Sequence, residues 1–329
     1  MYQKISSYNL TGVYFMKFNV IVITRKNLIR IIICLLSLLA LLALILGVRY
    51  LKTSKDTFSL INSKEISFKE DFNGDGSNDV LYIKTNDDKY FMELSTGNST
   101  IPISSKDEKT SLGKYDSLWP MKITFLDADR NRIPEIYLQS SENNMAIQHI
   151  FLYDNDNFKD LLCTNNNILG FLDYNNGKTP KIISGSYIKG SLDLGYYVLK
   201  NKALKNYSFD GNALPGGSVI KSFILYMESL PYGEGDMPNI FFSGLSGNAL
   251  SAIGKISAES MSIKFQDGYF HDTKWNKNGE PSEIIWTINL KNTAKNPGSS
   301  PKNYTLNVIL NEDTASNNQL RISAIYEKK

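Results

Sequence analysis

The apolar run at residues 31–48 restricts the fold of this chain more than any other feature. It reads IIICLLSLLALLALILGV and contains no charged residue and no proline. As a helix rising 1.5 Å per residue it spans about 27 Å, close to the ~30 Å hydrocarbon core of a bilayer. Because a helix also satisfies its own backbone hydrogen bonds in lipid, the sequence predicts one transmembrane helix over 31–48.

Charge alone does not decide the orientation of this helix. Basic residues flank it on both sides, at Lys17, Arg25, Lys26, Arg30, Arg49, Lys52 and Lys55. The positive-inside bias is therefore weak. We expect the N-terminus inside, because a short tail before a large domain is the usual signal-anchor arrangement. Residues 1–30 are then a cytoplasmic tail, and residues 49–65 a polar stalk outside.

Two alternatives concern the N-terminal end of the chain. A cleaved signal peptide would have a shorter apolar stretch ending in a small-x-small site, and the run here ends in LILGV. We therefore favour an anchor. Cys34 follows three isoleucines, which is unlike a lipoprotein acylation site. Residues 1–15 show no clear pattern, and a start at Met16 is more natural, which indicates an extension of the gene model.

Composition narrows the classes of function. The chain has 36 basic and 33 acidic residues and a formal charge of +3, which is too balanced for a nucleic-acid surface. It has two histidines, so few are available for Ser-His-Asp or Cys-His catalysis or for a His-rich metal site. With Cys34 in the apolar run and Cys163 the other cysteine, we expect no disulfide within the folded domain.

The region after the stalk has the texture of a β protein. Short runs of Val, Ile, Tyr and Phe alternate with clusters of Asn, Asp, Gly and Ser. The clearest predicted strands are 79–85, 89–94, 134–140 and 149–154. In the C-terminal part, alternating segments at 284–290, 304–310 and 320–326 predict an antiparallel meander with one buried face.

One helix and one boundary are expected in this region. In residues 218–230 the apolar side chains recur at helical spacing, at 219, 220, 223, 224, 227 and 230. Just before it, NALPGG at 212–217 indicates a boundary. The domains are thus a repeat region at 66–211, defined below, and a β-rich C-terminal region at 212–329.

Residues 71–79 carry the clearest chemistry. The segment reads DFNGDGSND, with oxygen-bearing residues at its first, third, fifth and ninth positions around a glycine turn. This frame lets one short loop surround a hard cation such as Ca²⁺. The candidate ligands are Asp71, Asn73, Asp75, the Ser77 carbonyl and Asp79. The match to an EF-hand ends there, because Tyr82 stands where the EF-hand has its glutamate.

The same frame recurs 56 residues later. Residues 127–135 read DADRNRIPE, and an apolar strand follows as it does after the first loop. The candidate ligands are Asp127, Asp129, Asn131, the Ile133 carbonyl and Glu135. Arg132 occupies the position of the turn glycine, where a left-handed conformation costs about 1 kcal/mol. A degraded third copy begins at Asp173 and has Lys181 at its ninth position, which opposes cation binding.

These loop segments and the strands after them resemble the FG-GAP/VCBS repeats, the calcium-loop blades of integrin-α-type β-propellers. DFNGDGSNDVLYI is similar to the loop-plus-strand word of that family, FLDADRNRIPEIYL is a looser match, and GFLDYNNGKTPKII is a remnant. The resemblance covers about residues 66–190. It implies bound calcium, an extracytoplasmic location and a role in binding or scaffolding. Because two or three blades cannot close a propeller, either divergent blades follow or the structure stays open and packs on a separate domain.

Other polar and aromatic residues have plainer interpretations. His149 and His271 lack a partner motif, so we interpret them as ordinary surface or strand histidines. Glu228, Glu234 and Asp236 are acidic side chains of a solvated loop region rather than an acid/base pair. The tryptophans are interpreted as core residues rather than a sugar platform; they are Trp119, Trp275 and Trp286.

Together these features predict a mainly β protein of a bacterial cell surface, held in the membrane by one helix. We expect it to bind or scaffold a protein or glycan partner outside the cell, to contact membrane lipid through 31–48, and to use calcium structurally, with no catalytic residues. One alternative is a membrane-anchored envelope hydrolase with its site in 190–329, whose signature would be a carboxylate pair. Another is an envelope sensor, which would need a partner because the inner tail is short.

Overall fold

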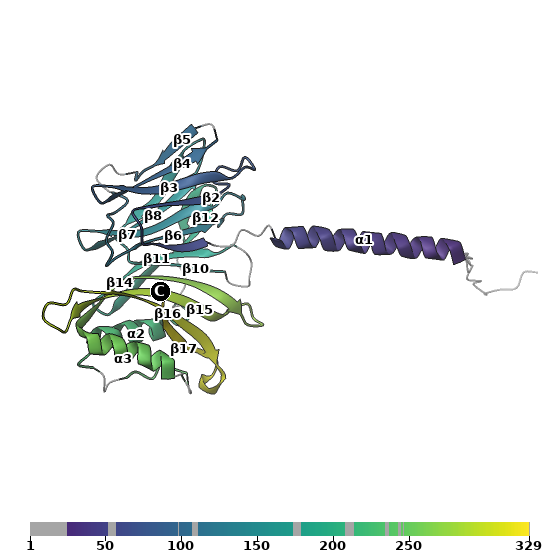
Figure 1. Cartoon of the computed structure of the whole chain (residues 1–329). Coiled ribbons are helices and arrows are strands. Elements are labelled where there is room, and N and C mark those ends of the chain that lie inside the picture. Colours follow the sequence, from purple (N-terminus) through teal and green to yellow (C-terminus); the bar gives the residue numbers. More distant parts are fainter. Residues whose placement is uncertain are drawn as a thin grey trace, which may run out of the picture. The chain divides into compact units, whose positions relative to one another are not determined.

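The computed structural model of the chain describes residues 25–51, 57–97, 99–106, 111–173, 179–207, 214–233, 237–242, 245 and 247–328. The chain divides into two units, Met1–Ser54 and Lys55–Lys329, which are described separately. The first contains helix α1, Arg25–Leu51, which covers the predicted apolar run (Figure 1). Among the described residues, no helix has the length and hydropathy needed to cross a membrane. Most of the predicted inner tail lies outside these residues.

The second unit is mainly β and contains three sheets. The smallest is a four-stranded antiparallel meander in the order β2-β3-β4-β5. Its strands are β2 Glu65–Glu70, β3 Asp79–Asn86, β4 Lys89–Thr96 and β5 Ser99–Ile103. The strands predicted at 79–85 and 89–94 are therefore confirmed. Alternate residues of β3 and β4 are buried, as expected for a sheet with one face on a core.

The second sheet has five strands in the order β1-β6-β7-β8-β9, all antiparallel. They are β1 Thr57–Ile61, β6 Met121–Leu126, β7 Glu135–Glu142, β8 Met145–Tyr153 and β9 Phe158–Thr164. β6 and β7 are almost fully buried, which makes this the middle layer of the unit's N-terminal half. The predicted strands at 134–140 and 149–154 are confirmed as β7 and β8.

The third sheet has eight strands in the order β13-β12-β11-β10-β14-β15-β16-β17. Its first half is a meander of β10 Ile168–Leu172, β11 Lys181–Ile188, β12 Ser191–Lys200 and β13 Ala203–Asn206. Its second half is β14 Ser260–Trp275, β15 Pro281–Ala294, β16 Asn303–Asp313 and β17 Gln319–Glu327, with a short 3-10 helix η2 at Thr314–Ser316. The predicted C-terminal meander is confirmed in β15–β17.

The two halves of this sheet join through a parallel pair. β10 runs parallel to β14, with Ile168 opposite Gly268 and Phe171 opposite His271. The boundary expected at 212–217 therefore lies between two segments that share one sheet. Gly170 allows this close approach, because a Cβ there would lie 2.2 Å from the ring of Phe270.

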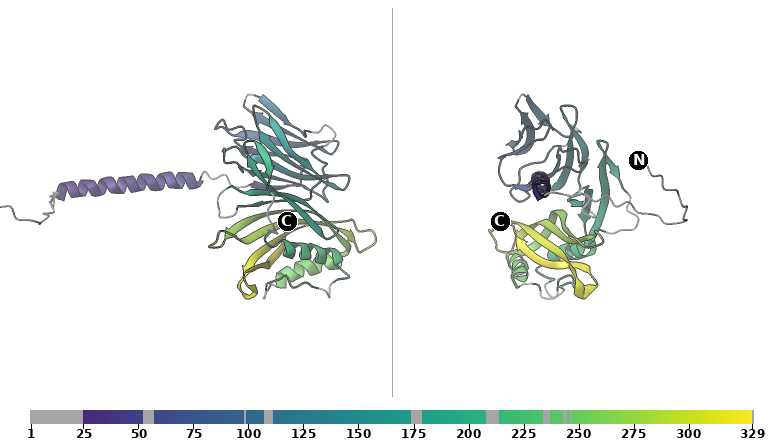
Figure 2. Two further views of the ribbon diagram at one scale, coloured as in Figure 1. Left: turned by 180° about the vertical axis from the view of Figure 1, so that it is seen from behind. Right: turned by 90° about the vertical axis from the view of Figure 1, so that its right-hand side faces the viewer.

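Helices α2, Gly217–Ser229, and α3, Gly247–Glu259, lie against the sheet of β14–β17 (Figures 1 and 2). α2 confirms the helix predicted at 218–230, and its buried side chains include Ile220, Phe223 and Met227. They pack in one cluster with Trp286 and the inner faces of β14–β17. Each element supplies one apolar face, so the pair of helices and the sheet share a single core.

Two further cores lie between the sheets of the N-terminal half. The first joins the four-stranded and five-stranded sheets, with Leu81, Leu94 and Ile123 among its members. The second joins the five-stranded sheet to β10–β14, through Tyr137, Phe171 and other side chains. Three antiparallel meanders are thus stacked on one another. In each meander, one of the three loops identified in the sequence connects the first two strands. These strand pairs are β2 and β3, β6 and β7, and β10 and β11.

A buried polar cluster also joins β6 to β14. The Lys122 ammonium contacts the Asp267 carboxylate, and both side chains are almost completely buried. Trp119 Nε1 donates to Asp267 Oδ2 at 2.7 Å. Burial, with the nearby charge of Lys328, lowers the pKa of Lys122 well below its usual value. The cluster fixes the middle sheet against the eight-stranded sheet through residues 145 positions apart.

Candidate metal centres

The first candidate loop connects β2 to β3 and is held by its own carboxylates. Gly74 and Gly76 have φ of +82° and +87°, values that glycine adopts without strain. Their N–H groups donate to Asp71 Oδ1 and Oδ2 at 2.7 and 2.9 Å. Asp79 Oδ2 accepts from Phe72 N at 3.0 Å and closes the loop. The glycine positions in the motif therefore have the conformational role that the sequence predicts.

The remaining predicted ligands of this loop lie on its exposed side. Asn73 Oδ1 accepts from Asp75 N at 2.9 Å, and Asp75 Oδ1 accepts from Ser77 N at 2.7 Å. The bond from Ser77 N, followed by one from Asn73 Nδ2 to Asp75 Oδ2, lowers the pKa of Asp75. Burial raises the pKa of Asp79. The side-chain oxygens of the loop therefore gather at one turn. There they accept hydrogen bonds from backbone N–H groups and from the Asn73 amide.

The second candidate loop connects β6 to β7 and repeats this pattern. Asp127 Oδ1 and Oδ2 accept from Asn131 N and Arg132 N at 3.0 and 2.8 Å. Asn131 Oδ1 accepts from Ile133 N at 2.7 Å. Arg132 has φ of +74°, so the residue in the glycine position does adopt the left-handed conformation. Two different sequences thus fold into the same kind of loop.

Three carboxylates converge in the second loop. One oxygen from each of Asp127, Asp129 and Glu135 lies within 4.8 Å of the others. Glu135 is 1% exposed, and its Oε2 accepts from Ala128 N at 2.8 Å. Its Oε1 is buried and has no hydrogen-bond partner in the described part of the chain. A buried oxygen without a donor is unfavourable, and a cation is one group that would satisfy it.

The electrostatics of this cluster follow from its burial. Desolvation, together with the negative charges of Asp129 and Asp127, raises the pKa of Glu135 to about 8. Burial likewise raises the pKa of Asp127. Burial and mutual repulsion oppose ionisation of these carboxyl groups. A cation bound here would favour the ionised form. The donor set therefore fits a hard divalent ion.

The two loops lie next to each other. A Cβ added to Gly74 would come within 2.7 Å of Ile133 Cδ1, so the turn of the first loop contacts the end of the second. Sequence reasoning finds both loops by their spacing but does not predict this contact. The third copy is described in part: Asp173 Oδ1 accepts from Thr179 N at 3.2 Å, and the predicted positions Asn175 and Gly177 lie outside the described residues.

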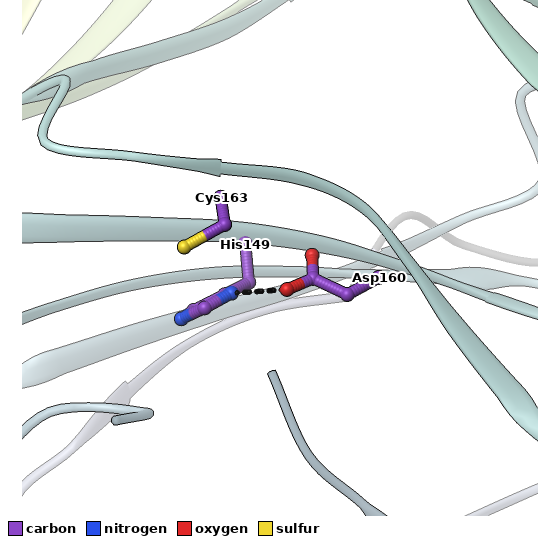
Figure 3. Close-up of side chains that lie close together, drawn as sticks. All are labelled: His149, Asp160 and Cys163. Atoms are coloured by element: carbon purple, nitrogen blue, oxygen red, sulfur yellow. Dashed lines mark hydrogen bonds and ion pairs between the residues drawn. The ribbon is translucent and has the colours of Figure 1, made fainter. Parts of the chain in front are cut away.

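The sequence interpretation overlooked a second cluster of ligand-type side chains. His149, Asp160 and Cys163 lie together on β8 and β9, with one ligand atom from each within 4.8 Å of the others (Figure 3). His149 is completely buried and its Nδ1 lies 2.9 Å from Asp160 Oδ2. It is therefore a buried strand histidine with an acidic partner. His271 lies on β14, and burial lowers its pKa.

A register shift brings this cluster together. His149 pairs with Cys163 across the β8·β9 hairpin, so both side chains share one face. The ladder then shifts between Ile150 and Phe151, where Leu161 is the extra residue, and this shift adds Asp160 to the same face. The Cys163–His149 pairing is consistent with the hairpin spacing in the sequence. The bulge has no such signal, because no glycine or proline marks it.

Of the acidic residues discussed near 230, the structure describes Glu228. Glu228 accepts from Phe265 N at 3.0 Å and from the Tyr187 hydroxyl at 3.2 Å, so it connects α2 to β14 and β11. Glu234 and Asp236 lie outside the described residues. Trp119 and Trp286 are buried, as predicted, whereas Trp275 is half-buried and donates to Asp272.

The comparisons with known proteins leave the family open. No family model, no curated protein and no solved structure matches the chain. The resemblance to FG-GAP/VCBS repeats therefore depends on the motif words and on the loops that they form.

Proposed function

We propose that this protein is a cell-surface binding or scaffolding protein whose β domain is stabilised by calcium. The observation that carries the proposal is the second loop, where three carboxylates converge and the buried Glu135 Oε1 has no donor among the described residues. Asp127, Asp129 and Glu135 would hold the ion, with Asn131 and the Ile133 carbonyl completing an oxygen-only set. The ion would neutralise the cluster and tie the loop to β7.

The arrangement of the loops supports an FG-GAP-like assignment. Each of three successive meanders places its loop between the first and second strands of a four-stranded unit, at β2–β3, β6–β7 and β10–β11. We interpret these meanders as blades of an incomplete propeller. The third blade continues into β14–β17 through the parallel β10·β14 pair, so the open end is covered by the rest of its own sheet. Repeats without closure suit a scaffold, since the first two blades expose loops of the same kind.

The calcium concentration that the loops need indicates on which side of the membrane the β domain lies. Modules of this type bind calcium at about 10⁻⁴ to 10⁻³ M, so their loops fill outside the cytoplasm. On this basis we propose that residues 55–329 lie outside the cell and that the apolar run at 31–48 is the membrane anchor, with its N-terminus inside. Cell-surface proteolysis tests this location: protease added to intact cells should remove the β domain, and an intact chain under conditions that digest a known surface protein would contradict it.

A calcium-dependent melting temperature tests the structural role of the ion. With calcium at 5 to 50 times Kd, each occupied loop should add about 1 to 2 kcal/mol to the free energy of unfolding. For a domain of this size that raises the melting temperature by about 2 to 8 °C over the value in chelator. Scanning calorimetry of the full chain measures this shift, and an unchanged midpoint would refute structural calcium.

Three variants locate the effect within the protein. Glu135→Gln keeps the size of the side chain and removes its charge, so the calcium-induced shift should become smaller. Asp173→Ala lies in the degraded third loop and should leave the shift as in the natural chain. Asp75→Ala should reduce stability in calcium more than Asp173→Ala does. Equal effects of these two alanine variants would contradict the ranking of the loops.

A second candidate function is supported by a cavity of about 920 Å³ beside β8, β11 and β14. Glu228 is the one carboxylate among its described lining residues, which also include the lysines Lys189, Lys264 and Lys291. A glycoside hydrolase needs two carboxyl groups at the bond it cleaves. The cavity therefore favours ligand binding over the hydrolase alternative. A screen of anionic glycans against the natural chain and Lys264→Ala would detect such binding.

A further inference from the structure

We propose that His149, Asp160 and Cys163 form a zinc-binding site, separate from the calcium-type loops. The ligand atoms would be His149 Nδ1, Asp160 Oδ1 and Cys163 Sγ. One ligand atom from each residue already lies within 4.8 Å of the others. Figure 3 shows the three side chains close together, with His149 and Asp160 facing each other. This inference does not depend on the calcium proposal.

The chemistry of the donors selects the ion. A nitrogen, an oxygen and a sulfur donor form a mixed set of borderline softness, which suits Zn²⁺. Calcium and magnesium prefer oxygen alone, so they are poor occupants of a site that contains a thiolate. In Zn²⁺ sites the metal lies about 2.0 to 2.3 Å from each ligand atom. Ligand atoms as close as these three can reach such distances with small side-chain rotations.

The orientation of His149 is that of a metal ligand. Its Nε2 lies 3.2 Å from the carbonyl oxygen of Ser111, and a carbonyl can only accept. A neutral ring has one N–H for these two acceptors, so when Nε2 donates to the carbonyl, Nδ1 presents its lone pair toward Asp160 Oδ2, 2.9 Å away. Two lone pairs at this distance repel each other unless a cation lies beside them. Metal-bound histidines characteristically donate their other N–H to a carbonyl or carboxylate, as Nε2 does here.

Asp160 is held in a matching way. Its Oδ2 accepts from Lys106 N at 3.1 Å and from the Ser105 hydroxyl at 3.3 Å, in addition to its contact with His149. Its Oδ1 is buried and has no hydrogen-bond partner in the part of the chain that the structure describes. The side chain is 1% exposed, so bulk water does not compensate this oxygen. One oxygen is thus fixed by donors while the other remains available for an ion.

Cys163 provides the third ligand. It is half-buried, whereas His149 and Asp160 are buried, so it is the ligand residue of the three with solvent contact. The Ser105 hydroxyl lies 3.9 Å from its sulfur. Three protein ligands leave a fourth tetrahedral position, which a water molecule can occupy. Binding would release the thiol proton, because zinc binds the thiolate.

The main alternative occupant is a proton, which would make His149 an imidazolium paired with Asp160. Metal content separates the two. The full chain, purified in detergent with excess calcium to fill the oxygen-only loops, is equilibrated with zinc, passed over a chelating resin and analysed by mass spectrometry for metal. We expect one zinc ion per chain. Absence of retained zinc would overturn the proposal.

Cobalt identifies the ligands without any mutation. Co²⁺ replaces zinc in tetrahedral sites, and a thiolate ligand gives an intense near-ultraviolet charge-transfer band. We expect this band in the natural chain and its loss when zinc is added back. Cobalt bound without the band would overturn the assignment of Cys163 as a ligand.

The chain provides matched controls for two of the three ligands, since it has two cysteines and two histidines. Cys163→Ser and His149→Gln should weaken zinc binding by more than the ~10- to 100-fold that loss of an outer-shell partner costs. Cys34→Ser and His271→Gln should leave it unchanged. Circular dichroism checks that each variant folds. Equal zinc affinity in a folded Cys163→Ser chain and in the natural chain would overturn the proposal.

Discussion

At the scale of single residues, the most informative feature is the buried ionisable side chain whose hydrogen bonds do not offset its loss of hydration. Asp272 on β14 is an example. Burial raises the pKa of this carboxyl to about 6, while hydrogen bonds from Trp275 Nε1 and Asp173 N oppose the shift. The folded protein therefore holds a proton there more tightly than the unfolded chain does.

This shift has a definite sign in a pH titration. Between the ordinary value of 3.8 and about 6, the folded state binds more protons than the unfolded state, so this group lowers the free energy of unfolding as pH rises. The change is at most about 1.4 kcal/mol per pH unit. Urea denaturation at pH 4 and pH 7 should show a smaller pH dependence in Asp272→Asn. The exposed Asp193→Asn is the control, and identical pH dependence in both variants would contradict the assignment.

The Lys122–Asp267 pair gives a second prediction at this scale. Lys122→Met leaves a carboxylate buried with Trp119 as its remaining donor, and should lower the free energy of unfolding by about 3 to 5 kcal/mol. Lys122→Met combined with Asp267→Asn removes both charges, so the double variant should recover much of that loss. Chemical denaturation of the single and double variants measures the coupling. Strictly additive effects would show that the two side chains do not act as a pair.

At the scale of elements, the contact between β10 and β14 allows a sharp test. Gly170 faces Phe270, whose ring stacks on Trp286 with centroids 4.2 Å apart. Gly170→Val places two methyl groups where no space exists, so we expect a loss of about 1 to 3 kcal/mol or more. Gly254→Ala on α3 meets nothing within 4 Å and should be neutral or slightly stabilising. Thermal melting compares the two, and an equally stable Gly170→Val would argue against this strand pairing.

Some elements could be predicted from the sequence and others could not. The alternation in 284–290 and the helical spacing in 218–230 identify β15 and α2, because each element buries one face. α3 is less visible, since GNALSAIGKISAE contains two glycines and several small and polar residues and is less apolar overall than α2. β14 mixes charged and apolar residues, and it contains Asp267-Gly268, a dipeptide that signals a turn in the sequence but lies inside this strand. The parallel pairing of β10 with β14 involves partners 100 residues apart, such as Ile168 and Gly268, and periodicity carries no information about it.

The candidate sites divide in the same way. The calcium-type loops are local, so their spacing alone predicts Asp127 and Glu135, and burial of Glu135 follows from its place at the start of β7. The cluster at His149 is not local. It depends on a hairpin register, on a bulge, and on Lys106 and Ser111 contributed by another segment of the chain. The low histidine count of the sequence therefore does not indicate that His149 lies beside two other ligand-type side chains.

At the scale of the whole unit, residues 55–329 should behave as one cooperative domain. The sheet continues across residue 212, and Ile168, Leu172 and Ile183 share a core with α2 and β14–β17. Fragments divided at 212 would each expose this core, so neither should fold alone. Calorimetry of the full chain should show one transition for this unit. Two separate transitions, or a folded fragment of residues 213–329, would contradict the shared core.

The position of β1 has a mechanical consequence under the membrane anchoring that we propose. β1 is an edge strand of the five-stranded sheet, and its five residue pairs with β6 connect the chain that leaves α1 to the rest of the unit. Tension along the chain from its N-terminal side therefore loads the β1·β6 ladder before any other strand. β6 also carries Lys122, which contacts Asp267 on β14. A pulling force would thus pass from the edge strand into the centre of the eight-stranded sheet, and the ladder would be the first element to yield.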